Sequence, residues 1–244
     1  MRSSATTKIR ALVILTASLV ISSSQLQISL ANPSPNTQTQ SATPTTTTQS
    51  PSSSQSPLAI DLLNELAVKG RAPKTGYSRA AFGQAWADVD RNGCDTRNDI
   101  LKRDLTNLAF KAKTRNCVVL SGILNDPYSG ERIEFIRGEK TSELVQIDHI
   151  VALSNAWQTG AFQKSLSERM QFANDPFNLL AVKGALNSQK GDGDAATWLP
   201  PLKSFRCEYI ARQIAVKKRY GLWVTPPEKE AMVRILKSCP NQKA

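Results

Sequence analysis

The chain has 244 residues, of which 40% are hydrophobic and 21% charged, and its formal net charge is +11. Its N-terminal apolar run of about 11 residues is too short for a permanent membrane-spanning helix. A chain this basic attracts polyanions such as nucleic acid, acidic glycans or anionic surfaces, and charge alone does not choose among them.

The N-terminal segment has the pattern of a secretory signal peptide over residues 1–31. Three basic residues precede the apolar run, and Ser29 and Ala31 are the small residues before a cleavage point at Asn32. We therefore expect a secreted or periplasmic protein with no stable membrane insertion after cleavage; an uncleaved anchor is the alternative. Removing the three basic residues of this segment lowers the net charge from +11 to about +8.

Residues 32–57 are almost entirely Ser, Thr, Pro, Gln and Asn, without a single charge. Such a composition cannot bury a core, so it predicts a disordered linker. The folded part is then residues 58–244, which is enough for one domain with a real core.

Four cysteines follow, and none of them lies in a C-x-x-C pair, which disfavours a structural zinc site. An even number in an exported protein favours two disulfides. We favour the sequential pairings Cys94–Cys117 and Cys207–Cys239. The other two connectivities and free buried thiols stay open.

Apolar periodicity and turn residues predict the following elements in chain order. The first half has a short helix around Leu62–Val68, a helix over Tyr77–Trp86 with Ser78 as N-cap, a polar loop over Asp88–Asp99, and a helix from Asn98 that carries Ile100 to Phe110. Strands are expected at Cys117–Gly122 and Glu131–Ile136, around the turn Asn125–Gly130, and at Val145–Ile147. Helices are expected over Ala152–Gln163, Phe177–Gln189, Lys203–Arg219 and Pro227–Ser238. One hairpin among several helices makes the fold class α+β.

Three motifs follow one another in the second half of the chain. The only histidine lies in the segment VQIDHIVAL at Val145–Leu153, and it is followed by NDPFNLL at Asn174–Leu180 and LNSQKG at Leu186–Gly191. This order resembles the His-Asn-His (HNH) nucleases of the ββα-metal superfamily. It is most similar to the branch that forms the C-terminal domain of GmrSD-type restriction enzymes, with a core at about 117–200.

The resemblance implies a role for each motif position. His149 would be the general base that activates water, and Asp148 would bind a metal ion. Asn178 would hold the imidazole or the loop that carries it. Asn187, where the family often has a final histidine, would be the second metal ligand. The resemblance also implies a ββα-metal hairpin and helix, surrounded here by additional helices.

The chemistry of the residues agrees with these roles. A neutral imidazole accepts protons near pH 7. If the only histidine is the base, the metal ligands are oxygens, and these suit Mg²⁺ or Mn²⁺. Because neighbours on a regular strand face opposite ways, Asp148 and His149 need a strand end or a distorted turn. The alternative is that His149 is an ordinary half-buried residue and Asn178 a turn residue.

Basic residues near the motifs are candidate phosphate contacts. Lys190 belongs to the third motif, while Arg169 and Lys183 could equally be solvated surface residues. A basic run near residues 212–219, with Tyr220 and Trp223 nearby, is a candidate nucleic-acid platform. We favour the alternative, an ordinary basic helix face next to aromatic residues of the core.

A separate segment, Asp88–Asp99, matches the D-x-D-x-N-G start of a calcium loop. Asp95 stands at a position that is normally apolar, and Asp99 stands where glutamate is usual. Calcium binding is therefore one reading, and a loop of Asx turns pinned by Cys94 is the other.

Together these features predict a secreted endonuclease that hydrolyses phosphodiester bonds of DNA, with RNA as a second candidate. No recognition domain is evident, so low sequence specificity is expected, and no protein partner is evident. The rivals are a non-catalytic protein of the same fold that binds nucleic acid or envelope polymer, and a calcium-stabilised envelope protein.

Overall fold

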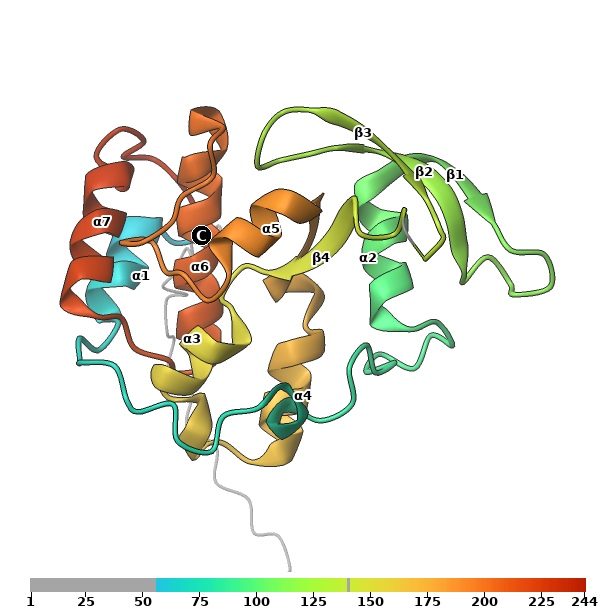
Figure 1. Cartoon of the computed structure of the whole chain (residues 1–244). Coiled ribbons are helices and arrows are strands. Elements are labelled where there is room, and N and C mark those ends of the chain that lie inside the picture. Colours follow the sequence, from blue (N-terminus) through green and yellow to red (C-terminus); the bar gives the residue numbers. More distant parts are fainter. Residues whose placement is uncertain (1–55, 140) are drawn as a thin grey trace, which may run out of the picture. The chain divides into compact units, whose positions relative to one another are not determined.

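A computed structural model describes residues 56–139 and 141–244 of the chain. The signal peptide and nearly all of the linker predicted for residues 1–57 lie outside the described residues. The described part is α+β, as expected, and has two small antiparallel sheets among its helices (Figure 1). Both predicted disulfides, Cys94–Cys117 and Cys207–Cys239, are present.

The helices of the described residues are α1 (Ala59–Glu65), α2 (Thr96–Asp104), α3 (Leu153–Gln158), α4 (Leu166–Asn174), α5 (Gly184–Lys190), α6 (Arg206–Arg219) and α7 (Pro226–Leu236). The strands are β1 (Leu105–Phe110), β2 (Val119–Asn125), β3 (Arg132–Ile136), β4 (Val145–His149) and β5 (Leu179–Lys183). Short 3-10 turns are η1 (Arg79–Phe82), η2 (Ala161–Gln163), η3 (Pro176–Asn178) and η4 (Lys203–Phe205). None of the helices in the described ranges is long and apolar enough to cross a membrane.

The β4–β5 pair forms the centre of the fold. Ile147 and Ala181 face a hydrophobic cluster shared with α2 and the sheet β1–β2–β3. Leu180 and Val182, on the opposite face, belong to the cluster formed with α1, α6 and α7. Figure 1 shows β4 and α5 between these two halves. Because β5 is covered on both faces, its sequence is a continuous apolar run rather than an alternating one.

Two predicted helices turn out to be partly strand. The helix expected over Phe177–Gln189 begins only at Gly184, because residues 179–183 form β5 and pair with β4. The helix expected from Asn98 to Phe110 ends at Asp104, since residues 105–110 form β1 and pair with β2.

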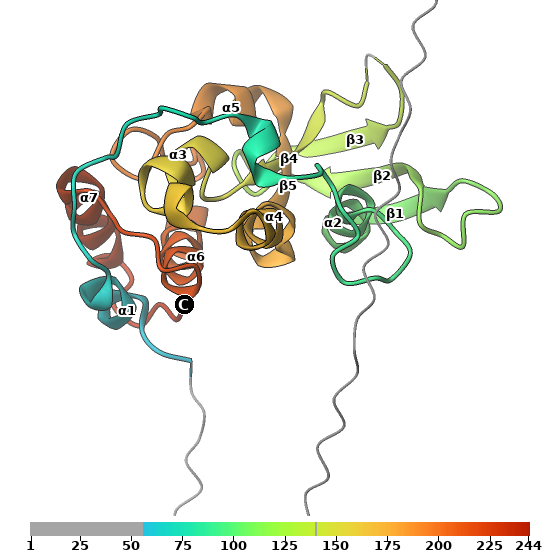
Figure 2. The same cartoon turned by 90° about the horizontal axis from the view of Figure 1, so that it is seen from below.

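Smaller differences concern caps and short segments. Asp95 rather than Asn98 caps α2, because the Asp95 side chain accepts the Asn98 N–H at 2.8 Å. The helix expected over Tyr77–Trp86 is only the 3-10 turn η1, capped by Ser78 as expected. The remainder of the segment between α1 and α2 has turns and bends but no further helix, and η1 within it contacts α3 and α4 (Figure 2). Helix α4 was not expected; it starts with a capping box formed by Ser165 and Glu168.

The junction of β5 and α5 has no room for a side chain at Gly184. A Cβ atom there would lie 1.9 Å from the carbonyl oxygen of Glu143. We expect Gly184→Ala to lower the free energy of unfolding by about 1–3 kcal/mol, the usual cost of overpacking. Urea denaturation measures it. Gly70→Ala is the control, since a Cβ at Gly70 meets nothing within 4 Å; equal stabilities for the two variants would contradict the prediction.

Candidate active site

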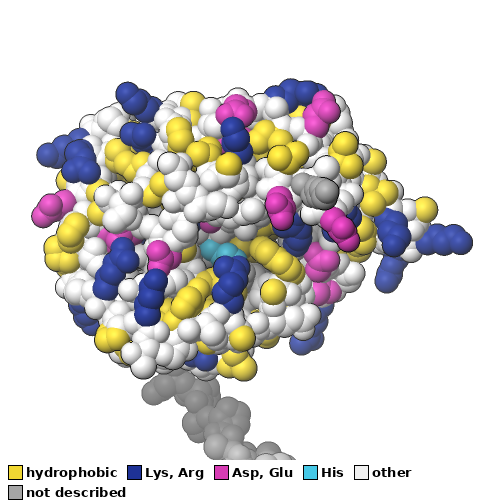
Figure 3. Space-filling view, viewed as in Figure 1, with side chains coloured by type: hydrophobic (Ala, Val, Ile, Leu, Met, Phe, Trp, Pro, Cys, Tyr) yellow, Lys and Arg dark blue, Asp and Glu magenta, His cyan; other side chains and the backbone are white. Residues whose placement is uncertain are grey.

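The end of β4 brings three of the predicted site residues to one cavity. Asp148, His149 and Asn187 line a polar space of about 70 Å³, which is enough for an ion with water molecules. β4 ends at His149, so the strand end that adjacent Asp148 and His149 require is present. The space-filling view shows the only histidine side chain at the surface, with Lys and Arg side chains beside it (Figure 3).

The carboxylate of Asp148 is buried and has a partner on each oxygen. Oδ1 accepts from the ammonium of Lys190 at 2.9 Å, and Oδ2 accepts from the hydroxyl of Tyr128 at 2.5 Å. The Lys190 ammonium also donates to the carbonyl of His149 at 2.8 Å. Burial and the nearby Asp148 charge raise the pKa of Tyr128 well above its ordinary value, so the phenol stays a hydrogen-bond donor.

The ring of His149 is held by one nitrogen. Nε2 lies 2.8 Å from the carbonyl oxygen of Ala173, which can only accept a hydrogen bond. Nε2 therefore carries the proton in the neutral ring, and Nδ1 carries the lone pair. Burial lowers the pKa of His149 to about 4, which keeps the ring neutral at pH 7. The indole of Trp86 stacks beside it, with ring centroids 6.1 Å apart.

Asn178 contacts the loop that carries His149 rather than the imidazole itself. Its Oδ1 accepts from the N–H of Val151 at 2.9 Å, and its backbone carbonyl accepts from the N–H of Ile150 at 2.8 Å. Its Nδ2 donates to the carbonyl of Phe172, which immediately precedes Ala173. Asn178 is fully buried. It thus ties the chain after His149 to the chain that holds the His149 ring.

Asn187 lies on α5 and faces β4. Its Nδ2 donates to Oε1 of Gln146 at 2.8 Å, which fixes the orientation of the amide. The amide oxygen is the group left for the cavity that Asn187 lines. Asp148 from β4 and Asn187 from α5 are therefore brought to the same space.

The three residues expected to contact phosphate all have protein partners. Lys190 is buried, and its contacts to Asp148 and His149 leave it no access to a phosphate at the surface. Lys183 contacts both carboxylate oxygens of Glu131 at 2.7 Å. Arg169 donates to backbone carbonyls of η1 and of the turn before α4, and lies over the ring of Trp157.

Sequence reasoning missed two groups at this site. Tyr128 comes from the turn between β2 and β3, and only its place in the fold reveals its contact with Asp148. Arg79 is an exposed residue of η1 that lines the polar cavity and also a neighbouring cavity of about 200 Å³. The second cavity shares His149 and Leu153 with the first. No motif in the sequence links η1 to β4.

The Asp88–Asp99 segment has the contacts of an Asx-turn loop. Both oxygens of Asp88 accept backbone N–H groups, from Asn92 at 3.0 Å and Gly93 at 2.9 Å, and Cys94 ties the loop to Cys117. Within residues 56–139 and 141–244 no three His, Cys, Asp or Glu side chains are grouped to hold a metal ion. Calcium in this loop stays an untested expectation that no contact supports.

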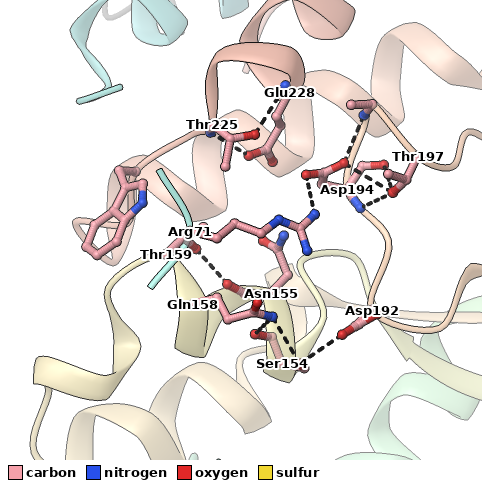
Figure 4. A network of polar contacts seen from close by, with 12 residues as sticks. Arg71, Ser154, Asn155, Gln158, Thr159, Asp192, Asp194, Thr197, Thr225 and Glu228 are labelled. Atoms are coloured by element: carbon pink, nitrogen blue, oxygen red, sulfur yellow. Dashed lines mark hydrogen bonds and ion pairs between the residues drawn. The ribbon is translucent and has the colours of Figure 1, made fainter. Parts of the chain in front are cut away.

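A polar network connects three segments near the site: the chain before η1, helix α3 and the loop after α5 (Figure 4). The guanidinium of Arg71 binds the buried carboxylate of Asp194 at 2.6 Å, and the hydroxyl of Ser154 on α3 donates to Asp192 at 3.0 Å. Lys74 also binds Asp192, at 2.5 Å. The extended segment before η1 is thereby joined to the loop that follows Lys190.

We expect the Asp148–Lys190 pair to be essential for stability. Lys190→Met leaves the buried carboxylate without its cation, which should lower the free energy of unfolding by about 3–5 kcal/mol. Lys183→Met is the matched control, because the Lys183–Glu131 pair is partly exposed and should contribute less than about 1 kcal/mol. Urea denaturation of both variants measures the difference. Similar small losses in both would show that the Asp148 carboxylate does not depend on Lys190.

Known proteins that resemble the chain show which family it is related to. A model of the C-terminal domain of GmrSD restriction endonucleases matches residues 95–235. A protein of Arthroderma benhamiae, described as an uncharacterized secreted protein, is 39% identical over 183 residues, covering 74% of this chain and 84% of that protein. No solved structure matches. The family supports a nuclease-related function with nucleic acid as the substrate. The chain therefore belongs to the family of C-terminal domains of GmrSD restriction endonucleases.

Proposed function

We propose that the protein is a secreted endonuclease of the HNH type that hydrolyses phosphodiester bonds of DNA with low sequence specificity, with RNA as a second candidate substrate. The observation that carries this proposal is the cavity at the end of β4, lined together by Asp148, His149 and Asn187. Secretion is supported by the leader pattern of residues 1–31 and by the description of the Arthroderma benhamiae relative.

His149 is the proposed general base. Its Nε2–H is committed to the carbonyl of Ala173, so Nδ1 is the atom that accepts a proton from the attacking water. The neutral state of the ring is the one that this task needs. Asn178 and Trp86 act as positioning residues, because they hold the loop and the ring face without reaching the proton.

The donor set at the cavity fits one weakly held Mg²⁺ or Mn²⁺. A carboxylate has about four lone-pair sites, of which Lys190 and Tyr128 use one on each oxygen of Asp148. Asp148 and the oriented amide oxygen of Asn187 would hold the ion, with water and substrate phosphate in the other positions. The ion would stabilise charge that develops on the phosphate and the leaving oxygen. Since Lys190 already neutralises Asp148, affinity should be low before substrate binds.

Arg79 is the proposed phosphate contact, in place of the three basic residues expected from sequence. It is exposed, and it lines the polar cavity beside His149. A guanidinium presents a planar fork of donors that matches phosphate oxygens. Lys190 instead holds the Asp148 carboxylate and the His149 carbonyl in place through its two hydrogen bonds.

We expect His149→Ala to lower the rate of plasmid nicking by at least about 100-fold, because the proton acceptor is lost. The assay follows conversion of supercoiled to nicked plasmid with Mg²⁺, Mn²⁺ or EDTA, and urea denaturation confirms that the variant is folded. Equal nicking by the variant would remove the proposed base. Plasmid retardation on a gel without nicking by either protein would favour the rival, a non-catalytic binder of nucleic acid.

We expect Asn187→Ala to raise the Mg²⁺ concentration needed for half-maximal nicking by at least about tenfold, because one oxygen ligand is lost. Asn187→Asp should restore it, since a carboxylate oxygen replaces the amide oxygen and the Gln146 amide can turn to donate to the other oxygen. Ser188→Ala is the control, an exposed neighbour on α5 that lines neither cavity. An unchanged Mg²⁺ requirement in Asn187→Ala would contradict the role of the amide.

A further inference from the structure

The larger cavity beside His149 is apolar, unlike the polar cavity that it adjoins. It has a volume of about 200 Å³, against about 70 Å³ for the polar space. Phe82, Trp86 and Leu153 form its apolar walls, and Gln84 adds an exposed amide side chain. A concave apolar space with few polar groups is the usual form of a ligand site.

One wall is the indole of Trp86, a residue whose backbone conformation is strained. Trp86 has φ of +57°, which bulky residues rarely adopt. Its carbonyl accepts from the N–H of Thr96 at 3.3 Å, and its side chain packs against the cluster of α2 and the three-stranded sheet. Strain of this kind is maintained by the surrounding structure and gathers at ligand sites. Here it places an indole face parallel to within 21° of the His149 ring.

The two cavities meet at the groups proposed for phosphate chemistry. Arg79, His149 and Leu153 line both of them. A phosphate that contacts Arg79 and faces His149 would therefore have the apolar cavity directly beside it. The part of a nucleic acid that is flat, has apolar faces and carries hydrogen-bonding edges is the base.

We propose that the apolar cavity binds the base of the nucleotide next to the cleaved phosphodiester, so that the protein takes single-stranded or locally unpaired nucleic acid. This proposal rests on the proposed nuclease function. A base can enter a cavity only when it leaves its helical stack, and this is easiest in a single strand. Stacking on an aromatic ring tolerates every base, which agrees with the low sequence specificity proposed above.

The test compares two labelled thymidine hexanucleotides, one intact and one with every base removed to leave abasic sugars. Fluorescence anisotropy with the wild-type protein in EDTA gives both affinities, and a gel confirms that both strands stay intact. We expect the intact strand to bind about tenfold more tightly, the usual effect of stacking one base.

Variants locate the effect. Ala85→Phe places a ring in the cavity from an exposed position and should abolish the preference for the intact strand. Trp86→Ala should do the same, and Ala85→Phe keeps the test valid if Trp86→Ala does not fold. Phe162→Ala is the control, an exposed aromatic residue that lines neither cavity and should keep the preference.

Equal affinity of wild-type protein for the two strands, or a preference that survives in Ala85→Phe, would overturn the proposal. The plasmid assay separates this failure from failure of the nuclease function. Nicking without a preference for bases removes the base site alone. A preference for bases without cleavage of either the plasmid or the intact hexanucleotide in Mg²⁺ keeps the base site and removes the nuclease.

Discussion

The buried ion pair between Asp148 and Lys190 is the interaction on which the site depends. It joins the end of β4 to the end of α5, and Tyr128 adds the turn between β2 and β3. A buried ion pair is favourable only when the remaining hydrogen-bonding capacity is used, and the additional bond from Lys190 to the His149 carbonyl contributes to this. Three separate segments are thus fixed around a single carboxylate.

The opposite side of the site is fixed by backbone contacts rather than charges. The buried Asn178 side chain makes hydrogen bonds to two backbone segments, at Val151 just after His149 and at Phe172 just before Ala173. Ala173 then holds the ring nitrogen. Because Asn178, Val151 and Phe172 are buried, the direction of the imidazole is set before any substrate arrives, which the proposed proton transfer requires.

The α+β class followed from the order of predicted elements, and the two disulfides were favoured from the even number of cysteines. The resemblance of the three motifs to a known family indicated that Asp148, His149 and Asn187 lie together. Sequence reasoning failed where tertiary contacts override local pattern. The run Leu179–Lys183 has no alternation, and a strand covered on both faces cannot be distinguished from a helix by periodicity. The segment Leu105–Phe110 has helical spacing but pairs with β2. The burial of Lys190 and the contact of Tyr128 depend on segments that no local pattern connects.

The segment between α1 and α2 supplies Arg79 and Trp86, and it precedes the region that matches the family, which begins at residue 95. It is anchored by the Arg71–Asp194 pair and by the disulfide at Cys94. The groups proposed for catalysis and those proposed for substrate recognition therefore lie mostly in separate stretches of the polypeptide. The segment nevertheless reaches the proposed base directly, because the Trp86 indole stacks on the His149 ring and Arg79 lines the same polar cavity. A residue outside the matched region therefore forms one face of the environment of the single histidine.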